Sequence, residues 1–246
     1  MIPKKIHYVW MGGKAKPKKI QKCIKTWKRK LKDYEFIEWN ESNFDINSHP
    51  FVKAAYDNKK WAFVSDYVRA WAIYNYGGIY LDTDVYVIRK LDKLLDNKAF
   101  VGFERSDYPF TAVFGACKHH PFIKDMLDYY DGLDSYSFNF NDNNTLSVSK
   151  LLIDKYNCKR GNVEQLLKTG IKVYRDDILC NPSNSSITIH LFFGSWTGNT
   201  SFERKKHEFL RSKLSNKFNI WLYCLYKNIK LKIKRKKIGK NYEKKN

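Results

Sequence analysis

Hydrophobic and polar positions repeat with two periods along the chain, and these periods predict the elements of the fold. A period of two indicates strands at residues 5–10 (KIHYVW) and 34–39 (YEFIEW). Apolar residues three or four apart indicate a helix over residues 17–31, which begins at a proline. Residues 61–76 are apolar on nearly every side, which is typical of a buried helix, and Gly77 closes it.

The same two periods continue downstream of this helix. We expect strands at 81–87, 100–104, 110–117, 171–174 and 187–193, and helices near 121–130 and 146–156. Alternating strands and helices imply an α/β fold with a mainly parallel sheet. We find no internal repeat and no linker rich in Pro, Gly or Ser, so we expect one domain over residues 1–202 and a C-terminal extension over 203–246.

The run at 81–87 (LDTDVYV) contains two carboxylates. In a strand, Asp82 and Asp84 project from the same face, while Thr83 points away. Burying two bare carboxylates is costly, so they must share a cation or lie in water at a strand end. An oxygen-loving divalent ion, Mg²⁺ or Mn²⁺, meets this demand. Two solvated aspartates in a surface turn are the alternative.

The buried helix at 61–76 carries an unusual charged pair. Asp66 and Arg69 are three positions apart, so they share one face of the helix. An internal ion pair that only fixes packing is one interpretation. The other is that both side chains reach the strand end with the two aspartates, where Arg69 offers donors and Asp66 accepts from hydroxyl groups.

Two further segments carry candidate binding residues. In ITIHLFFGSW (187–196), His190 follows an alternating strand, and Ser195 and Trp196 follow a glycine. A histidine in this position is either a ligand or a satisfied core residue. Trp10 closes the first strand ahead of a Gly-Gly turn, where a flat ring either joins the core or supports a ligand base.

Composition indicates a folded protein with strongly basic ends. The 246 residues are 43% hydrophobic and 16% aromatic, which excludes a disordered chain. Residues 1–32 carry twelve basic and no acidic groups, residues 33–202 carry 18 against 22, and residues 203–246 carry 16 against 3. Basic ends on a slightly acidic body suit an anionic partner, either a membrane surface or a nucleic acid.

Cysteine usage and the absence of long apolar runs suggest where the protein resides. The five cysteines are an odd number without a CxxC motif, which argues against a disulfide framework and against a zinc site. A reducing cytoplasm is the expected location. No stretch resembles a signal peptide, and no apolar run reaches the roughly 18 residues that span a bilayer, so we expect neither export by that route nor an integral protein.

The basic tail has its own pattern. Apolar residues spaced by three or four, with lysines between and beyond, are Leu210, Leu214, Phe218, Trp221, Leu225, Ile229 and Ile233. This pattern predicts an amphipathic basic helix. One interpretation is peripheral contact of residues 210–240 with the anionic inner face of the cell membrane, near a lipid-linked acceptor. The other is a helix packed on the body and followed by a solvated lysine tail.

Three segments occur together and in order: IHYVWMGG, the pattern SDxxRxxxxxxxGGxYxDxD over residues 65–84, and IHLFFGSW. This set resembles glycosyltransferase family 32, the DxD sugar-binding transferases that include bacterial capsule and surface-polysaccharide enzymes and yeast mannosyltransferases. It is more distantly similar to the glucosyltransferase domain of large bacterial cytotoxins. The resemblance spans residues 2–196, and its central pattern is highly specific.

The resemblance implies a fold and an activity. The fold would be of GT-A type, a Rossmann-like mixed sheet flanked by helices. The activity would be a metal-dependent transfer of a hexose from a nucleotide-sugar, with a UDP-sugar favoured over a GDP-sugar. The acceptor would be a glycan or lipid-linked glycan of surface or capsular polysaccharide synthesis, and the anomeric configuration would be retained.

The resemblance also implies roles for single residues. Asp84 would bind Mn²⁺ or Mg²⁺ directly, Asp82 would contact the ribose and reach the metal through water, and His190 is the third candidate metal ligand. Many relatives have a second histidine where this chain has Leu191. The loose match of NDNNTLS (141–147) makes Asn144 a candidate near the acceptor, with a plain Asn-rich loop and helix cap as the alternative.

The remaining implied roles concern the donor. Asp66 and Arg69 match the positions that hold the donor sugar, and Trp10 matches the aromatic residue that stacks on the base. The implied catalytic set is Asp66, Arg69, Asp82 and Asp84. The implied donor-binding set is Val9, Trp10, Asp66, Arg69, Asp82, Asp84, Ser195 and Trp196. The last two residues, with His190, match a C-terminal loop that closes over the diphosphate and metal.

Two other protein classes remain as alternatives. Phosphatases of the haloacid dehalogenase type also carry DxDx(T/V) after a strand, but the fifth position here is Tyr86, and the motif lies after 80 residues rather than near the start. A nucleic-acid-binding protein would explain the net charge of +21. We find no nucleic-acid-binding module between the basic ends, so we expect no nucleic acid as partner.

Overall fold

The computed structural model describes residues 1–133, 144–193 and 208–243, with side chains described as far as residue 230. The strands are β1 (Lys5–Val9), β2 (Glu35–Trp39), β3 (Gly78–Leu81), β4 (Val85–Val87), β5 (Ala99–Gly102), β6 (Val113–Ala116), β7 (Gln165–Leu166), β8 (Ile171–Tyr174) and β9 (Thr188–His190). The α-helices are α1 (Lys18–Lys30), α2 (Pro50–Asp57), α3 (Trp61–Tyr76), α4 (Pro121–Asp131), α5 (Asn144–Asp154), α6 (Asp176–Leu179) and α8 (Lys217–Glu243). Three short 3-10 turns are η1 (Ile46–Ser48), η2 (Asp92–Leu94) and η4 (Lys168–Gly170).

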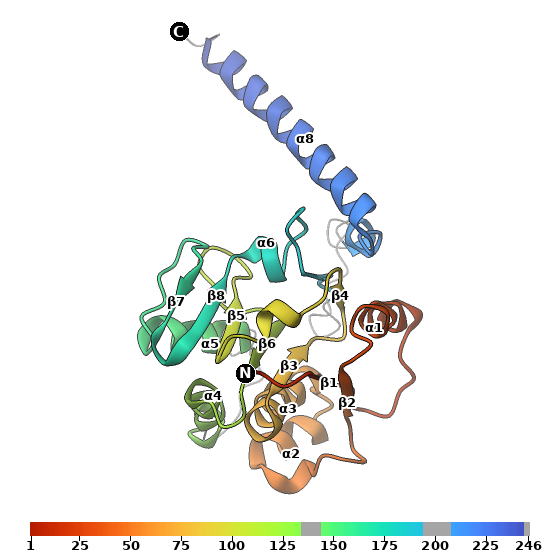
Figure 1. The fold of residues 1–246 in the computed structure, drawn as a ribbon, viewed down its shortest axis with the longest axis vertical. Coiled ribbons are helices and arrows are strands. Elements are labelled where there is room, and N and C mark those ends of the chain that lie inside the picture. Colours follow the sequence, from red (N-terminus) through yellow and green to blue (C-terminus); the bar gives the residue numbers. More distant parts are fainter. Residues whose placement is uncertain (134–143, 194–207, 244–246) are drawn as a thin grey trace.

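The main sheet has seven strands in the order β2-β1-β3-β6-β5-β8-β7 (Figure 1). β1 is parallel to β2 and β3, and β5 is parallel to β8, whereas β6 is antiparallel to both of its neighbours and β7 is antiparallel to β8. The expected mixed sheet flanked by helices is therefore confirmed, but a mainly parallel sheet is wrong. The reason is that residues 103–112, which join β5 to β6, contain no crossover helix, so β6 returns antiparallel to β5.

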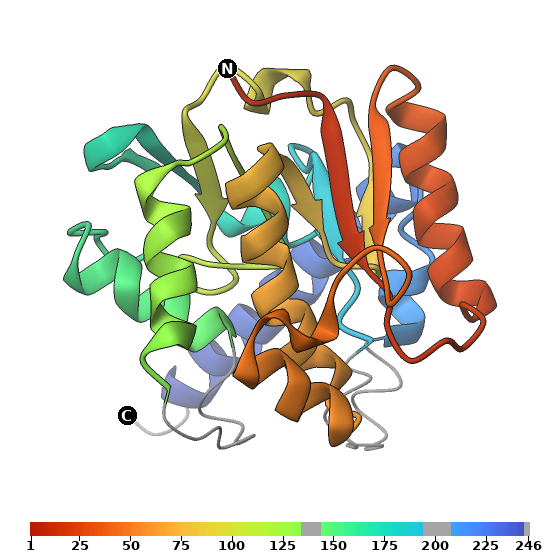
Figure 2. The same cartoon turned by 90° about the horizontal axis from the view of Figure 1, so that it is seen from below.

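Helices cover both faces of this sheet (Figure 2). Along β3, Tyr80 packs into one buried cluster with α3 side chains such as Val68, while Ile79 and Leu81 pack into a second cluster with Trp27 of α1. All five side chains are at most 1% exposed. The period of two in the strand thus divides the core into two layers.

The turn from α3 to β3 explains the Gly-Gly pair. Gly78 has φ +116°, and a Cβ atom there would lie 2.8 Å from the carbonyl oxygen of Lys5. Buried His7 accepts at Nδ1 from the Trp39 indole (3.1 Å), so its protonated Nε2 donates to the carbonyl oxygen of Gly77 (2.8 Å). Burial lowers the pKa of His7 to about 4. A neutral histidine therefore fixes the start of the strand that leads to the two aspartates.

The period of two predicted a strand that contains both aspartates, and this prediction is wrong. β3 ends at Leu81, and a turn follows in which the Val85 N–H donates to the Asp82 carbonyl oxygen (3.0 Å). β4 then pairs with β9 in a separate two-stranded sheet. The physical reason is the cost of burying two carboxylates. A turn leaves the side chains of Asp82 and Asp84 only half-buried at the sheet edge.

The tail is also not one helix from residue 210 onward. A helical turn over 208–212 precedes a break, and α8 begins at Lys217 and projects from the body (Figure 1). Leu214 and Ile220, each 2% exposed, pack into a third buried cluster with Ile189 of β9. The expected domain boundary at residue 202 lies outside the described residues. Within the described ranges, no helix combines the length and the hydropathy that crossing a membrane requires.

Candidate donor and metal site

The candidate site lies where β1 and β3 end and β4 begins. α1 supports this corner from the side, because the Trp27 indole donates to the Val85 carbonyl oxygen (2.7 Å) and the Val87 N–H donates to the Thr26 hydroxyl (3.0 Å). These bonds satisfy backbone groups on the edge of a three-residue strand. These two bonds hold the end of the turn with Asp82 and Asp84, and the Asp82 N–H, which donates to the Ala112 carbonyl oxygen (2.9 Å), holds its start.

Asp82, Asp84 and His190 come together at this corner. Each offers one ligand atom, and the three atoms lie within 4.8 Å of one another. The pairing of β4 with β9 sets Val85 opposite His190, which brings a histidine 106 positions downstream beside Asp84. The His190 Nε2 lies 3.3 Å from Asp84 Oδ1, and the Phe193 N–H donates to Asp84 Oδ2 (2.9 Å).

This arrangement fits a divalent ion. Ligand atoms about 2.1 Å from an octahedral centre lie about 3–4 Å from one another, which a group within 4.8 Å satisfies after small adjustments. Two carboxylates suit Mg²⁺ or Mn²⁺, and the imidazole adds a nitrogen ligand. Asp82, Asp84 and His190 would hold the ion. Their roles as ligands remain predictions.

Opposite charges shift the pKa values of this pair in opposite directions. Burial alone would lower the pKa of His190, but the Asp84 carboxylate outweighs it and raises that pKa well above 6.5. Burial alone would raise the pKa of Asp84, but His190 and the hydrogen bond from Phe193 lower it. Without metal, a histidine cation therefore neutralises the carboxylate.

Arg69 joins the helix to the turn. Its Nη2 lies 3.0 Å from Asp66 Oδ1 and 3.2 Å from Asp82 Oδ1. It also donates to the Ser65 hydroxyl (2.9 Å), and its guanidinium lies 4.6 Å from the centre of the Tyr80 ring. The Tyr80 hydroxyl donates to Asp82 Oδ1 (2.9 Å). The two charges that the sequence placed on one helix face thus reach the aspartate turn.

Asp66 carries the only carboxyl group of α3, and this group is buried. Its residue is 8% exposed, and burial raises its pKa to about 7, although Arg69 opposes this shift. The backbone N–H of Asn144 also favours its charged form. A carboxyl group that titrates near neutrality is a strong acceptor for a sugar hydroxyl once it is ionised.

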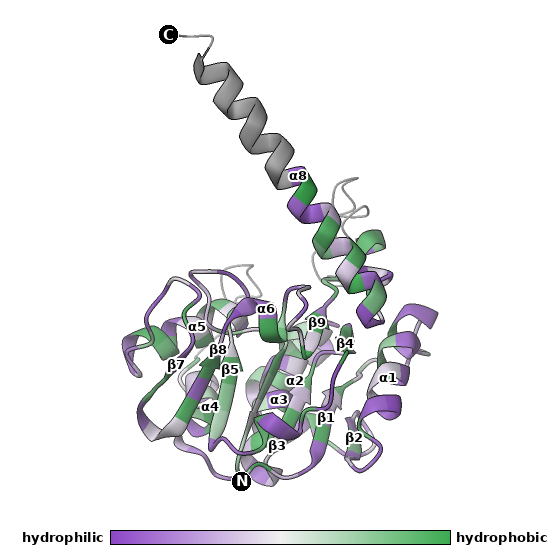
Figure 3. Ribbon diagram, turned by 45° about the horizontal axis from the view of Figure 1, so that its top comes forward, coloured by the Kyte–Doolittle hydropathy of each residue, from purple (hydrophilic) through white to green (hydrophobic). Residues whose placement is uncertain are grey.

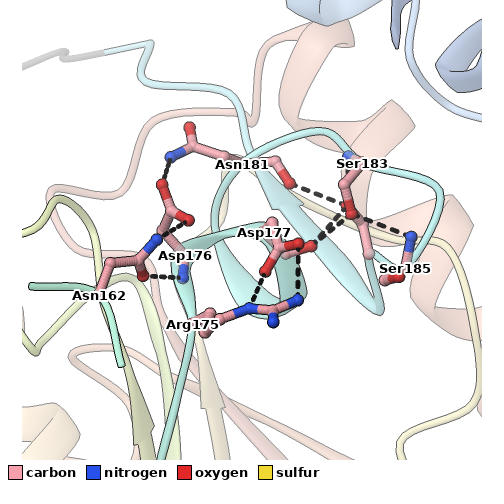
Figure 4. Close-up of polar contacts among 8 residues, drawn as sticks. Asn162, Arg175, Asp176, Asp177, Asn181, Ser183 and Ser185 are labelled. Atoms are coloured by element: carbon pink, nitrogen blue, oxygen red, sulfur yellow. Dashed lines mark hydrogen bonds and ion pairs between the residues drawn. The ribbon is translucent and has the colours of Figure 1, made fainter. Parts of the chain in front are cut away.

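A polar network lies next to β9, and Figure 4 shows the part of it that contains Asn162, Asp176 and Asn181. Asn162 and Asp176 exchange two hydrogen bonds (2.6 and 2.7 Å), and Asn181 donates to the same aspartate (2.7 Å). Arg211 then donates to the Asn181 side chain and to the backbone carbonyl oxygen of His190. The segment after residue 207 therefore braces the strand that carries the candidate ligand.

The other predicted residues divide into three groups. Trp10 is half-buried, with its indole donating to the Lys14 carbonyl oxygen (2.6 Å), whereas Val9 is a core residue with 7% exposure. Asn144 is 4% exposed, donates to the Tyr130 hydroxyl (3.0 Å) and lies beside Asp66. Ser195 and Trp196 lie outside the described residues.

The structure adds residues that the sequence interpretation left out. Glu104 follows β5, which runs in the same direction as β3, so it lies at the same edge of the sheet. Burial raises its pKa, and the charges of His190 and Asp82 act on it. A search for acids that follow parallel strands finds this residue, whereas nothing in the sequence distinguishes Arg211 from the other cations of the tail.

Both the sheet and the segment with the acidic turn have counterparts among known proteins. The crystal structure of a glycosyltransferase involved in the glycosylation of the major capsid of PBCV-1 matches with a TM-score of 0.50 and 13% identity, over 82% of this chain and 97% of that chain. At this identity the likeness concerns the fold, and it confirms the GT-A architecture. The glycosyltransferase sugar-binding region containing the DXD motif matches residues 17–101. Residues 17–101 therefore match the glycosyltransferase family that the motifs indicated.

Two curated relatives extend the comparison. Inositol phosphoceramide mannosyltransferase 3 of Schizosaccharomyces pombe is 33% identical over 143 residues, which are 56% of this chain and 39% of that protein. Human alpha-1,4-N-acetylglucosaminyltransferase is 31% identical over 105 residues, which are 42% of this chain and 26% of that protein. The chain thus matches less than half the length of these relatives.

Proposed function

We propose that the protein transfers a hexose from a nucleotide-sugar to a glycan or lipid-linked glycan acceptor, with a divalent ion at the DxD turn. The observation that carries the proposal is the convergence of Asp82, Asp84 and His190, whose ligand atoms lie within 4.8 Å of one another. This convergence occurs in a chain with the DXD sugar-binding region.

Each group of residues has a distinct task in this proposal. A divalent ion, when bound, stabilises the negative charge of the leaving diphosphate as a Lewis acid. Arg69 and Asp66 bind hydroxyl groups of the donor sugar and orient its anomeric carbon towards the acceptor. The exposed part of Trp10 stacks on the nucleotide base. Arg69 also keeps Asp82 oriented, because it pairs with that carboxylate at 3.2 Å.

The proposal extends to the identity of the acceptor and of the donor. The acceptor that we propose is a glycan or lipid-linked glycan of surface or capsular polysaccharide synthesis. The fission yeast relative is named for a lipid, inositol phosphoceramide, and this name supports a lipid-linked acceptor. We propose a UDP-sugar as donor, retention of the anomeric configuration and a cytoplasmic reaction.

The experiment measures melting temperature across a panel of nucleotide-sugars with and without Mn²⁺, followed by release of nucleoside diphosphate from the best donor. We expect one donor to raise the melting temperature only when Mn²⁺ is present, and an Arg69→Lys variant to lose most turnover because a bidentate fork becomes a point charge. A chain that releases phosphate from generic phosphoesters and ignores every nucleotide-sugar would instead be a phosphatase, and the proposal would fail.

A further inference from the structure

A hollow of about 580 Å³ lies where α1 and β4 end and α8 begins. Its lining is dominated by cations. These cations are Arg29, Lys30, Lys32, Arg89, Lys90 and Lys217, and we call the surface that they line the basic hollow. None of them belongs to the candidate donor site, so this charged surface has no part in the function proposed above.

The basic hollow keeps an excess of positive charge, although the Asp33 carboxylate attracts Lys90. Asp33 also lines it, but its carboxylate is paired with Lys4. In the part of the chain that the structure describes, none of the six cations forms an ion pair, and Arg89 donates only to the Asn184 carbonyl oxygen. Cations that converge on a concave surface repel one another, so an anion bound there lowers the free energy.

An exposed apolar surface begins beside the basic hollow. It consists of Phe218, Trp221, Leu222, Leu225, Tyr226 and Ile229, which we call the apolar stripe and which are 43–66% exposed. Their spacing of three or four places them on one side of α8, and the stripe starts at the residue that follows Lys217 of the hollow. Apolar and polar bands alternate along the first part of α8 (Figure 3). The opposite side of the helix, with Ile220, packs on the body.

We infer that this side of the protein docks on an anionic lipid bilayer, with lipid phosphates in the basic hollow and the apolar stripe in the interface. A bilayer offers the two chemistries in the same order, anionic head groups beside acyl chains. The partner is therefore a membrane surface that contains anionic phospholipids. This docking surface corrects the pattern read from the sequence, because Leu214 is buried in the body and is not part of the stripe.

A nucleic acid fits the same surface less well. Phosphates of DNA or RNA would match the cations, and bases could stack on Trp221. Leu222, Leu225 and Ile229, however, are 43–49% exposed and would gain nothing from a sugar-phosphate backbone. A second copy of the chain would cover the stripe but would bring the same positive charge to the hollow.

The test is flotation of the full chain with vesicles of phosphatidylcholine, with and without phosphatidylglycerol. We expect binding only to the anionic vesicles. The hollow variant is Lys32→Gln/Arg89→Gln/Lys90→Gln. Because each cation near an anionic surface contributes about fivefold to affinity, we expect this variant to bind about 100-fold more weakly. The control is Lys118→Gln/Lys159→Gln/Lys168→Gln, which removes three exposed charges that do not line the hollow and should change binding less than about threefold.

The remaining arms separate the other partners. A Trp221→Ser/Leu225→Ser variant with an unchanged melting temperature should lose vesicle binding. Equal losses in the hollow and control variants would overturn the proposal, because net charge alone would then explain binding. Oligonucleotide binding and oligomeric state are measured alongside flotation. A hollow variant that loses oligonucleotide binding but still binds vesicles would overturn the proposal. So would a stripe variant that changes from dimer to monomer and still binds vesicles. No donor is present, so these results are independent of glycosyl transfer.

Discussion

Replacing Asp84 by Asn tests whether the DxD turn holds a divalent ion. The substitution keeps the shape of the side chain and an acceptor for the Phe193 N–H, but it removes the charge that faces His190 at 3.3 Å. The two side chains are only 14% and 12% exposed. Because His190 can release its proton once its partner is neutral, we expect a loss of about 1–3 kcal/mol in unfolding free energy. The variant should therefore still fold.

The decisive measurement is the Mn²⁺-dependent melting temperature. An ion present at 100 times its Kd stabilises the folded state by about 2.7 kcal/mol, which corresponds to a shift of about 5–10 °C for a chain of this size. We expect this shift in the wild type and less than about 1 °C in Asp84→Asn. The matched control is Asp92→Asn, which removes a carboxylate that is 40% exposed and pairs with Lys4 at 3.2 Å, and which should keep the full shift. A full Mn²⁺ shift in Asp84→Asn would refute the metal assignment.

Two further predictions concern stability. The pKa of Asp66 is raised from 3.8 to about 7 by burial, so its contribution is fully present below about pH 4 and is lost as the pH rises through 7, by up to about 4 kcal/mol. Denaturant unfolding at several pH values should show this decline in the wild type and not in Asp66→Asn; an equal decline in both would point to another group. Gly78→Ala should cost about 2–4 kcal/mol, because its Cβ would lie 2.8 Å from the Lys5 carbonyl oxygen, whereas Gly13→Ala, with nothing within 4 Å, should cost about 1 kcal/mol. Thermal unfolding compares the two variants, and equal losses would contradict the steric argument.

Elements with strong local signals were predicted well from the sequence. The helix at 61–76 was found at Trp61–Tyr76, because an apolar run ended by Gly77 has one local solution. The strand at 171–174 was found at Ile171–Tyr174. The helix α2 and the short elements α6 and β7 were missed, since eight residues or fewer carry too little periodicity.

The break inside LDTDVYV shows what periodicity cannot resolve. Every residue of β3 and β4 is buried, and Leu81, Val85 and Val87 keep odd positions apolar, so the pattern continues through the turn although the chain changes sheets. Only the cost of burying two charges indicated a strand end. His190 lies beside Asp84 because β4 pairs with β9, and the local sequence does not encode this pairing. The family resemblance supplied that candidate.

The side chains of α1 that close the edge of β4 also guard against misassembly. A short strand with free backbone groups is a template on which another chain can add a strand. Here Trp27 and Thr26 occupy the groups of Val85 and Val87 that an intruding strand would need. The acidic turn thus adjoins a strand whose outer edge, at Val85 and Val87, is closed to strand addition from another copy.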